Sequence, residues 1–205
     1  MKKLGFSLFL FCLWLPGQVA EVVAFEAETG TGNWLRNGDF RHGLHGWTVR
    51  FPEASETVYS RNHEWIEVSD NPLGTGRVIR FTLSRAVAAT EGVKAATPLM
   101  PVEAGVSYQF GADILSLGPS AKIILEGYVE DADRTAAGAD QIPGYRRIYR
   151  AVIHPKGVSG REWTTHRRII TPPARYQPTH VLFKLYAYWP EGVIYFDNAE
   201  FRRVE

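Results

Sequence analysis

Side chains suited to contacting a polar ligand recur at alternate positions in several segments of this 205-residue chain. In residues 106–114, Gln109 and Asp113 stand between apolar neighbours, and the same spacing links Glu126 to Tyr128. Alternate side chains of a β-strand point to one face of the sheet. The candidate binding residues chosen on this basis are Arg80, Gln109, Asp113, Glu126, Tyr128, Lys184, Tyr186 and Tyr188.

This mixture of rings and polar groups suits a neutral oligosaccharide. Sugar rings have C–H faces that pack on aromatic rings and hydroxyls that need both donors and acceptors. We expect Tyr128 and Tyr186 to be stacking platforms, with the other candidates as hydrogen-bonding partners, on the condition that all of them converge on one water-facing surface. The alternative is an ordinary solvated sheet face, on which tyrosines and charges form cross-strand pairs and no ligand binds.

A second candidate surface lies at the loop ends of the expected strands. It would consist of Tyr59, His63 and Trp65, together with the turn at Trp189, Pro190 and Glu191. Trp189 stands beside a proline in a turn, a position that favours exposure. The sequence favours the sheet face over this second surface.

The acidic residues give limited support to catalysis. Glu126 and Glu130 share a strand face but are separated by about 13 Å, whereas paired glycosidase carboxylates stand roughly 5 to 9.5 Å apart. Asp113 and Glu126 would be closer if their strands were neighbours. A polysaccharide lyase would instead use a phenolic or basic group beside cations, and residues 145–154 offer Tyr145, Arg146, Arg147, Tyr149 and His154. Alternation places Tyr145, Arg147 and Tyr149 on one strand face and His154 on the other. We expect no enzyme, because the sequence has no serine-hydrolase elbow, zinc-protease motif or phosphate loop.

The pattern of apolar residues predicts the elements that carry these side chains. Period-two alternation indicates strands over 106–114, 123–130 and 181–188, and further strands are expected at 76–83, 145–154, 162–171 and 192–201. Residues 131–140 lack alternation and predict a loop. Strands without intervening helices favour an all-β fold, an antiparallel β-sandwich formed by one domain over residues 34–205.

The N-terminus predicts export. Lys2 and Lys3 precede an apolar run at residues 4–15, which is too short to span a bilayer. We expect a signal peptide over residues 1–20, with cleavage as late as 24, and a leader over 21–33. The single cysteine, Cys12, lies in the apolar run, so the mature chain is expected to have no disulfide. The mature protein would be secreted or periplasmic, without insertion into a membrane.

The charge balance disfavours nucleic acid as a partner. The chain has 23 basic and 22 acidic residues, and the pairs of adjacent arginines are short and scattered. A nucleic-acid interface requires a concentrated basic patch. The expected partner is therefore an oligosaccharide or polysaccharide.

Motifs at the two ends and in the middle of the domain carry a resemblance to a known family. The chain opens with Asn37-Gly38-Asp39-Phe40 and Trp47, has a central segment at 102–108, and closes with Tyr195-Phe196-Asp197-Asn198-Ala199. In this it resembles the CenC-like carbohydrate-binding modules of families 4, 9 and 22, which are galactose-binding-domain-like jelly rolls. The resemblance implies a jelly-roll sandwich that binds glycan without catalysis. The alternative is a structural or adhesive cell-envelope scaffold without sugar binding. Such modules usually accompany an enzyme, and a single domain by itself departs from that pattern.

The same resemblance implies a structural calcium ion at the edge of the sandwich. Asp197 matches the acidic ligand of the closing strand, whereas Arg41 stands where an acidic side chain is usual after Phe40. Calcium requires six to eight oxygen ligands, and arginine provides none. Asp39 and Asp197 are therefore the candidate metal ligands, and the alternative is that both only accept hydrogen bonds in turns.

Overall fold

The computed structural model describes residues 32–49, 58–135, 142–173 and 175–204. The predicted signal peptide and nearly all of the predicted leader lie outside these ranges. So does the end of the loop predicted at 131–140, from residue 136 onward. Export and the cleavage site therefore stay predictions. Within the described ranges, no helix has the length and apolar character needed to cross a membrane.

Strands dominate the fold, and the two helices are short. A 3₁₀ helix, η1 (Val58–Glu64), precedes the first strand, and α1 (Arg85–Ala88) follows the second. The strands are β1 (Ile66–Asp70), β2 (Arg77–Leu83), β3 (Val93–Ala96), β4 (Met100–Pro101), β5 (Tyr108–Leu117), β6 (Ser120–Glu130), β7 (Tyr145–Ile153), β8 (Thr164–Ile170), β9 (His180–Tyr188) and β10 (Gly192–Arg203).

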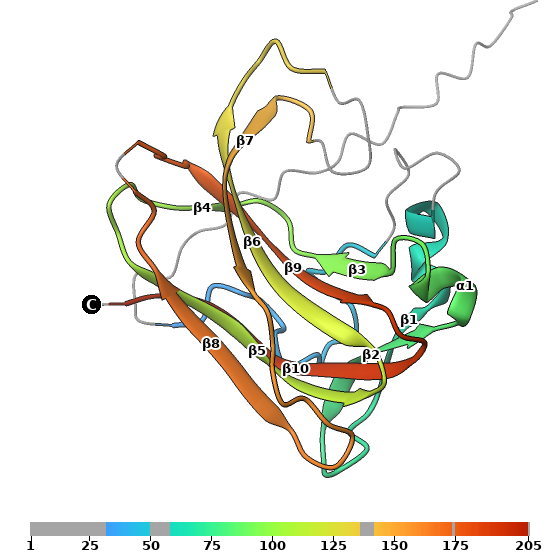
Figure 1. Ribbon diagram of the computed structural model, residues 1–205. Coiled ribbons are helices and arrows are strands. Elements are labelled where there is room, and N and C mark those ends of the chain that lie inside the picture. Colours follow the sequence, from blue (N-terminus) through green and yellow to red (C-terminus); the bar gives the residue numbers. More distant parts are fainter. Residues whose placement is uncertain (1–31, 50–57, 136–141, 174, 205) are drawn as a thin grey trace, which may run out of the picture.

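The strands form two antiparallel sheets. Sheet A has the order β3-β9-β6-β7, with β4 also paired to β9, and sheet B has the order β1-β2-β10-β5-β8. Figure 1 shows β5, β8 and β10 side by side in one layer and β6 and β9 together in the other. Consecutive strands β5 and β6 lie in different sheets. The predicted all-β sandwich is confirmed.

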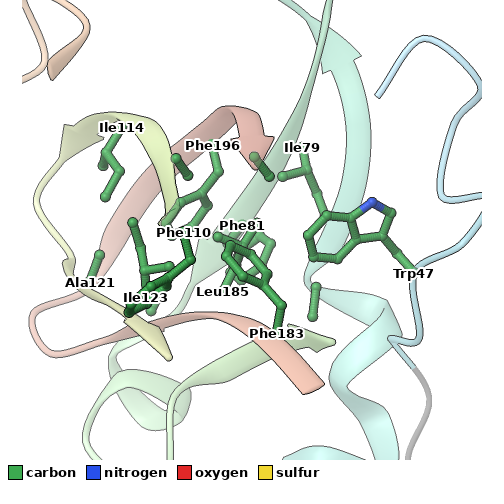
Figure 2. Packing of buried hydrophobic residues seen from close by; sticks show 14 of the residues in the cluster. Trp47, Ile79, Phe81, Phe110, Ile114, Ala121, Ile123, Phe183, Leu185 and Phe196 are labelled. Carbon is green, nitrogen blue, oxygen red and sulfur yellow. The ribbon is translucent and has the colours of Figure 1, made fainter. Parts of the chain in front are cut away.

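Apolar side chains from the inner faces of both sheets fill the space between them. Phe81 on β2, Phe110 on β5 and Phe196 on β10 meet Phe183 and Leu185 on β9, and each of the five is completely buried (Figure 2). Full burial of one such side chain contributes about 1.5–3 kcal/mol. This interface makes the sandwich the stable arrangement, because each strand alone leaves one apolar face uncovered.

The predicted strands agree with the structure, but the three shortest strands of the structure were not predicted. All seven predicted segments are strands, β2 and β5 to β10. β1 was not predicted, although Ile66 and Val68 alternate with polar residues as an edge strand requires. β3 and β4 have four and two residues, too few to show a period.

The opening motif packs against the closing strand. The pairing of β10 with β5 shifts register between Asp197 and Glu200, and the Ala199 N–H donates to the Gly38 carbonyl at 2.9 Å. The backbone φ is 56° at Asn37 and 54° at Phe40, so these two residues take the left-handed conformation in this turn. Gly38 is needed for another reason, the close approach of the two backbones. A Cβ atom at Gly38 would collide with the Ala199 carbonyl.

We expect Gly38→Ala to lower the free energy of unfolding by about 2–3 kcal/mol, because the added methyl group forces two backbones apart. Gly74→Ala is the matched control, since a Cβ there meets only the Asn71 side chain, at 3.8 Å. Denaturant unfolding of both variants measures the difference. Equal stability of the two variants would contradict this account of the junction.

Candidate functional site

The predicted binding residues lie on two opposite faces of the sandwich. Arg80 on β2, and Gln109 and Asp113 on β5, belong to the outer face of sheet B. The other five candidates belong to the outer face of sheet A: Glu126, Tyr128, Lys184, Tyr186 and Tyr188. For these eight residues, the predicted outward position within the strand was correct. The prediction that all eight share one surface is wrong, because alternation within a strand does not tell which sheet the strand joins.

A buried carboxylate is the centre of the group on sheet A. The Glu126 side chain is only 2% exposed, and Lys184 Nζ lies 2.7 Å from its Oε2. Arg147 Nη1 lies 2.7 Å from Oε1, and Arg150 Nε lies 3.6 Å from the same oxygen. The Tyr128 hydroxyl donates to Oε2 at 2.8 Å. We call these five residues the Glu126 cluster.

The cluster keeps Glu126 ionised. Burial by itself would raise the pKa of Glu126, but Lys184, Arg147 and the Tyr128 hydroxyl outweigh it, so the pKa lies below its ordinary value. A charge in this position is stable only while its partners remain. Arg147 and Arg150 were not among the predicted binding residues, although their strand had been recognised.

Tyr128 is not a stacking platform in this arrangement. It is 1% exposed and packs with Ala96 and Leu182, and Leu99 and Tyr145 lie against them. Its hydroxyl is engaged by Glu126. Tyr128 therefore presents no ring face for a ligand, which corrects the prediction made from its position on the strand.

A pair of stacked tyrosines lies on the same outer face. The rings of Tyr186 and Tyr188 have centroids 5.4 Å apart and planes inclined by 15°. Lys122 Nζ lies over both rings, 4.7 Å from the centroid of Tyr188 and 5.8 Å from that of Tyr186. The Tyr186 hydroxyl donates to the Glu91 carbonyl at 2.6 Å, which fixes the ring. Sequence reasoning missed Lys122, although it precedes Glu126 by four residues and so shares its face.

Tyr188 of this pair borders a hollow at the end of sheet A. This hollow has a volume of about 450 Å³, and its lining includes Tyr188, Ser120, His154 and Pro155. Beyond it, Trp189 is 51% exposed in the turn between β9 and β10. Trp189 thus has the exposure expected of the second candidate surface. The side chain of Tyr59, assigned to that surface, lies outside the described residues.

The candidates on sheet B are paired with other charged or polar side chains. Arg80 Nη1 lies 2.9 Å from Glu67 Oε1, and Gln109 Nε2 donates to Glu200 Oε1 at 2.6 Å. Arg167 lies between the carboxylates of Asp113 and Glu200, at 3.2 and 2.7 Å. The contact to Asp113 Oδ1 is close enough for an ion pair but lacks hydrogen-bond geometry, which is why that oxygen has no hydrogen-bond partner.

The candidate calcium ligands Asp39 and Asp197 lie close to this group, and the calcium ion stays a prediction. Asp39 is paired with Arg41 at 2.9 Å, and Asp197 Oδ1 accepts from the Asn198 N–H at 2.7 Å. Among the described residues, no group of three or more acidic, histidine or cysteine side chains is arranged to hold a metal ion. The guanidinium groups of Arg41 and Arg167 supply positive charge here.

The surroundings of Asp197 destabilise the ionised form of its carboxylate. Its pKa is raised to about 6, mainly by burial and further by the charges of Asp113 and Asp39, against the hydrogen bond from the Asn198 N–H. The ionised side chain therefore costs stability at neutral pH.

The acid–base groups considered for catalysis are not brought together. Asp113 is on β5 in sheet B and Glu126 is on β6 in sheet A, each on an outer face, so the core separates them. The pairing of β6 with β7 shifts register after Gly127, which opposes Tyr149, whereas Tyr128 opposes Arg147. Tyr149 therefore packs on the core while Tyr145 packs on the outer face. The prediction that Tyr145, Arg147 and Tyr149 share a face is wrong because of this bulge.

Comparison with known proteins shows which solved structures share this fold. No family model and no curated protein matches the sequence. A solved structure described as "CBM4 structure and function" has a TM-score of 0.52 at 13% identity, with 83% of this chain and 99% of that chain covered. A family 16 carbohydrate-binding module has a TM-score of 0.51 at 15% identity, with 84% and 100% covered.

A third match is the tandem CBM22 domain of Paenibacillus barcinonensis Xyn10C, with a TM-score of 0.50 at 14% identity. It covers 87% of this chain and 47% of the tandem. At such identities the likeness concerns the fold. The chain has the jelly-roll sandwich of carbohydrate-binding modules, and the predicted resemblance is confirmed at that level.

We expect Glu126→Gln to lower the free energy of unfolding at pH 7 by about 3 kcal/mol, because the buried Lys184 loses the negative charge of Glu126 beside it. A carboxyl with a lowered pKa stabilises the fold above its ordinary pKa of 4.5 and loses that contribution as the pH falls. The difference between wild type and variant should therefore shrink in acid.

The matched control for this substitution is Glu67→Gln, which breaks an exposed pair with Arg80. We expect it to cost less than about 1 kcal/mol. Urea unfolding at pH 7 and pH 3 measures the loss of free energy of unfolding in both variants. A loss no larger in Glu126→Gln than in Glu67→Gln would contradict the role assigned to the cluster.

We expect Asp197→Asn to weaken the pH dependence of stability between about pH 4 and 6. The native state binds a proton with a pKa of about 6 and the ordinary value is 3.8, so wild-type stability should fall as the pH rises across this window. Asparagine cannot titrate and removes that decline. Denaturant unfolding at several pH values measures it, with the exposed Glu191→Gln as control, and an unchanged slope in Asp197→Asn would refute the assignment.

Proposed function

We propose that the protein is an exported, non-catalytic β-sandwich that binds an oligosaccharide or polysaccharide on the outer face of sheet A. The observation that carries the proposal is the stacked pair Tyr186 and Tyr188 with Lys122 beside it. The N-terminal sequence supports export. The fold supports the class of ligand, because it is shared with structures described as carbohydrate-binding modules.

The tyrosine pair supplies the apolar part of such a site. The two stacked rings are each partly exposed and offer aromatic surface of the kind on which the C–H face of a sugar packs. The bond from Tyr186 to the Glu91 carbonyl holds the surface in place before the ligand arrives, so binding loses less conformational freedom. Lys122 would exchange its contact with the rings for a hydrogen bond to a sugar hydroxyl.

The polar part of the site lies along the same strands. Tyr188, Tyr186 and Lys184 are successive outward positions of β9, and Lys122 and Glu126 are outward positions of the neighbouring β6. Arg150 opposes Glu126 on β7 and is half exposed. A glycan lying across these strands would meet rings at one end and charged donors at the other. Arg80, Gln109 and Asp113 have no part in this site.

The second candidate function is a structural or adhesive envelope scaffold. The Glu126 cluster favours it, because a cross-strand network in which the charges satisfy one another is what a solvated sheet face without a ligand would have. The two functions differ in whether the tyrosine pair contacts a soluble glycan.

We expect Tyr188→Ala and Tyr186→Ala each to weaken glycan binding at least tenfold, since stacking on an aromatic ring is lost while the fold persists. The matched control is Tyr195→Ala, a partly buried tyrosine on the outer face of sheet B, at which binding should not change. Affinity electrophoresis of the mature protein through gels containing different polysaccharides gives the comparison, and circular dichroism checks the fold. Retardation by no polysaccharide would favour the scaffold, and equal loss in Tyr195→Ala would locate the site elsewhere.

A further inference from the structure

The hollow beside Tyr188 lies where β7 leaves the sheet. β6 pairs with β9 from Ser120 onward, but its pairing with β7 begins only at Ile123. Pro155 follows the end of β7 by two residues and has no N–H with which to continue the ladder. Within the described chain, the first residues of β6 therefore have no neighbouring strand on that side, and the hollow of about 450 Å³ lies there.

The inner side of the hollow is closed. Pro119 and Ala121 in its lining are buried, and Val158 packs against the core between the sheets. The turn between β5 and β6 and the segment after β7 are joined where the Ser116 N–H donates to the Ser159 carbonyl at 3.1 Å. A polymer that enters the hollow from the outer face of sheet A therefore meets packed residues, and its chain cannot continue through to the other side.

The outer rim of the hollow has polar side chains that are available to a ligand. Ser120 lies opposite Tyr188 in the pairing of β6 with β9, so both belong to the outer face of sheet A. Ser120 and His154 are exposed, and within the described part of the chain neither side chain has a hydrogen bond or an ion pair. A hydroxyl and an imidazole can each donate and accept, which is what sugar hydroxyls need. The rim thus adds polar partners to the aromatic surface of Tyr188.

The hollow and the tyrosine pair form one continuous surface. Tyr188 belongs both to the lining of the hollow and to the stacked pair with Tyr186. Pockets that bind small ligands have volumes of about 300–1,000 Å³, so a hollow of about 450 Å³ has room for a small ligand and not for a long run of polymer. A glycan that packs on the two rings would therefore reach the hollow with the sugar next to them.

We propose that the hollow binds the terminal sugar of a glycan chain, while the following sugars pack on Tyr188 and Tyr186 and extend along β9. This inference rests on the proposed function and defines which part of the glycan is recognised, namely a chain end. A groove open at both ends accepts any stretch of a polymer, whereas a hollow with a closed inner side accepts only a terminus. Ser120 and His154 form hydrogen bonds with the hydroxyls of that terminal sugar.

The test compares short and long chains of the same glycan. Isothermal titration calorimetry of the mature protein would use the hexasaccharide and the polymer of xylan, of a mixed-linkage β-glucan and of a galactan. For at least one of these glycans, we expect one protein molecule per chain at both lengths. We also expect dissociation constants, expressed per mole of chains, that differ less than threefold. A number of bound protein molecules that grows with chain length would overturn the inference.

Two substitutions localise the terminal sugar. Ser120→Trp places a large ring at the rim of the hollow and should weaken binding of the hexasaccharide at least tenfold. His154→Ala removes a hydrogen-bonding partner and should weaken it about threefold to tenfold. The control is Thr82→Trp, which adds the same ring at an exposed position on the outer face of sheet B and should leave binding unchanged.

Circular dichroism of all three variants checks the fold. His154 is an exposed residue outside the strands, so its substitution decides the question even if Ser120→Trp does not fold. Binding as tight as that of the wild type in a folded Ser120→Trp, or in His154→Ala, would contradict the inference.

The remaining outcomes separate this inference from the proposed function. If many protein molecules bind along each polymer chain and Tyr186→Ala weakens that binding, the inference fails and the glycan-binding function stands. If none of the hexasaccharides and polymers binds, both fail.

Discussion

Burial of apolar side chains between the two sheets constrains every other feature of this protein. A strand that points Phe110 or Phe183 into the core must point its alternate residues outward, because successive side chains of a strand lie on opposite faces. The outer faces are therefore fixed in composition once the core is filled. What each face can bind depends on which strands are brought together beside one another.

The outer face of sheet A shows how a polar surface becomes organised on such a scaffold. Glu126 on β6 forms ion pairs with two arginines of β7 and one lysine of β9. The residues of a single strand could not form this arrangement. A buried charge of this kind contributes little net stability, but removing one partner is costly. The cluster thus holds neighbouring strands in one register and leaves two arginines partly exposed, on the same outer face as the tyrosine pair.

The junction between the two ends of the domain is a second consequence of the sandwich. The register shift in β10 directs Ala199 toward Gly38, and the hydrogen bond between them joins the first described turn to the last strand. The same region gathers the carboxylates of Asp39, Asp113 and Asp197, with the guanidinium groups of Arg41 and Arg167 beside them. Positive charge is needed there in any case, since neighbouring buried carboxylates repel one another.

The sequence by itself determined the seven longest strands, the facing of most of their residues, and hence the all-β sandwich, because period-two alternation is a local property of each segment. It also identified Tyr186 and Tyr188 as candidate binding residues. The tertiary structure alone decided that β5 and β6 join different sheets, which separates Asp113 from Glu126. It decided as well that a bulge in β7 between Arg147 and Tyr149 turns Tyr149 inward and that Tyr128 is covered. These outcomes depend on contacts between segments far apart in the chain, and alternation within one segment carries no information about its neighbours in space.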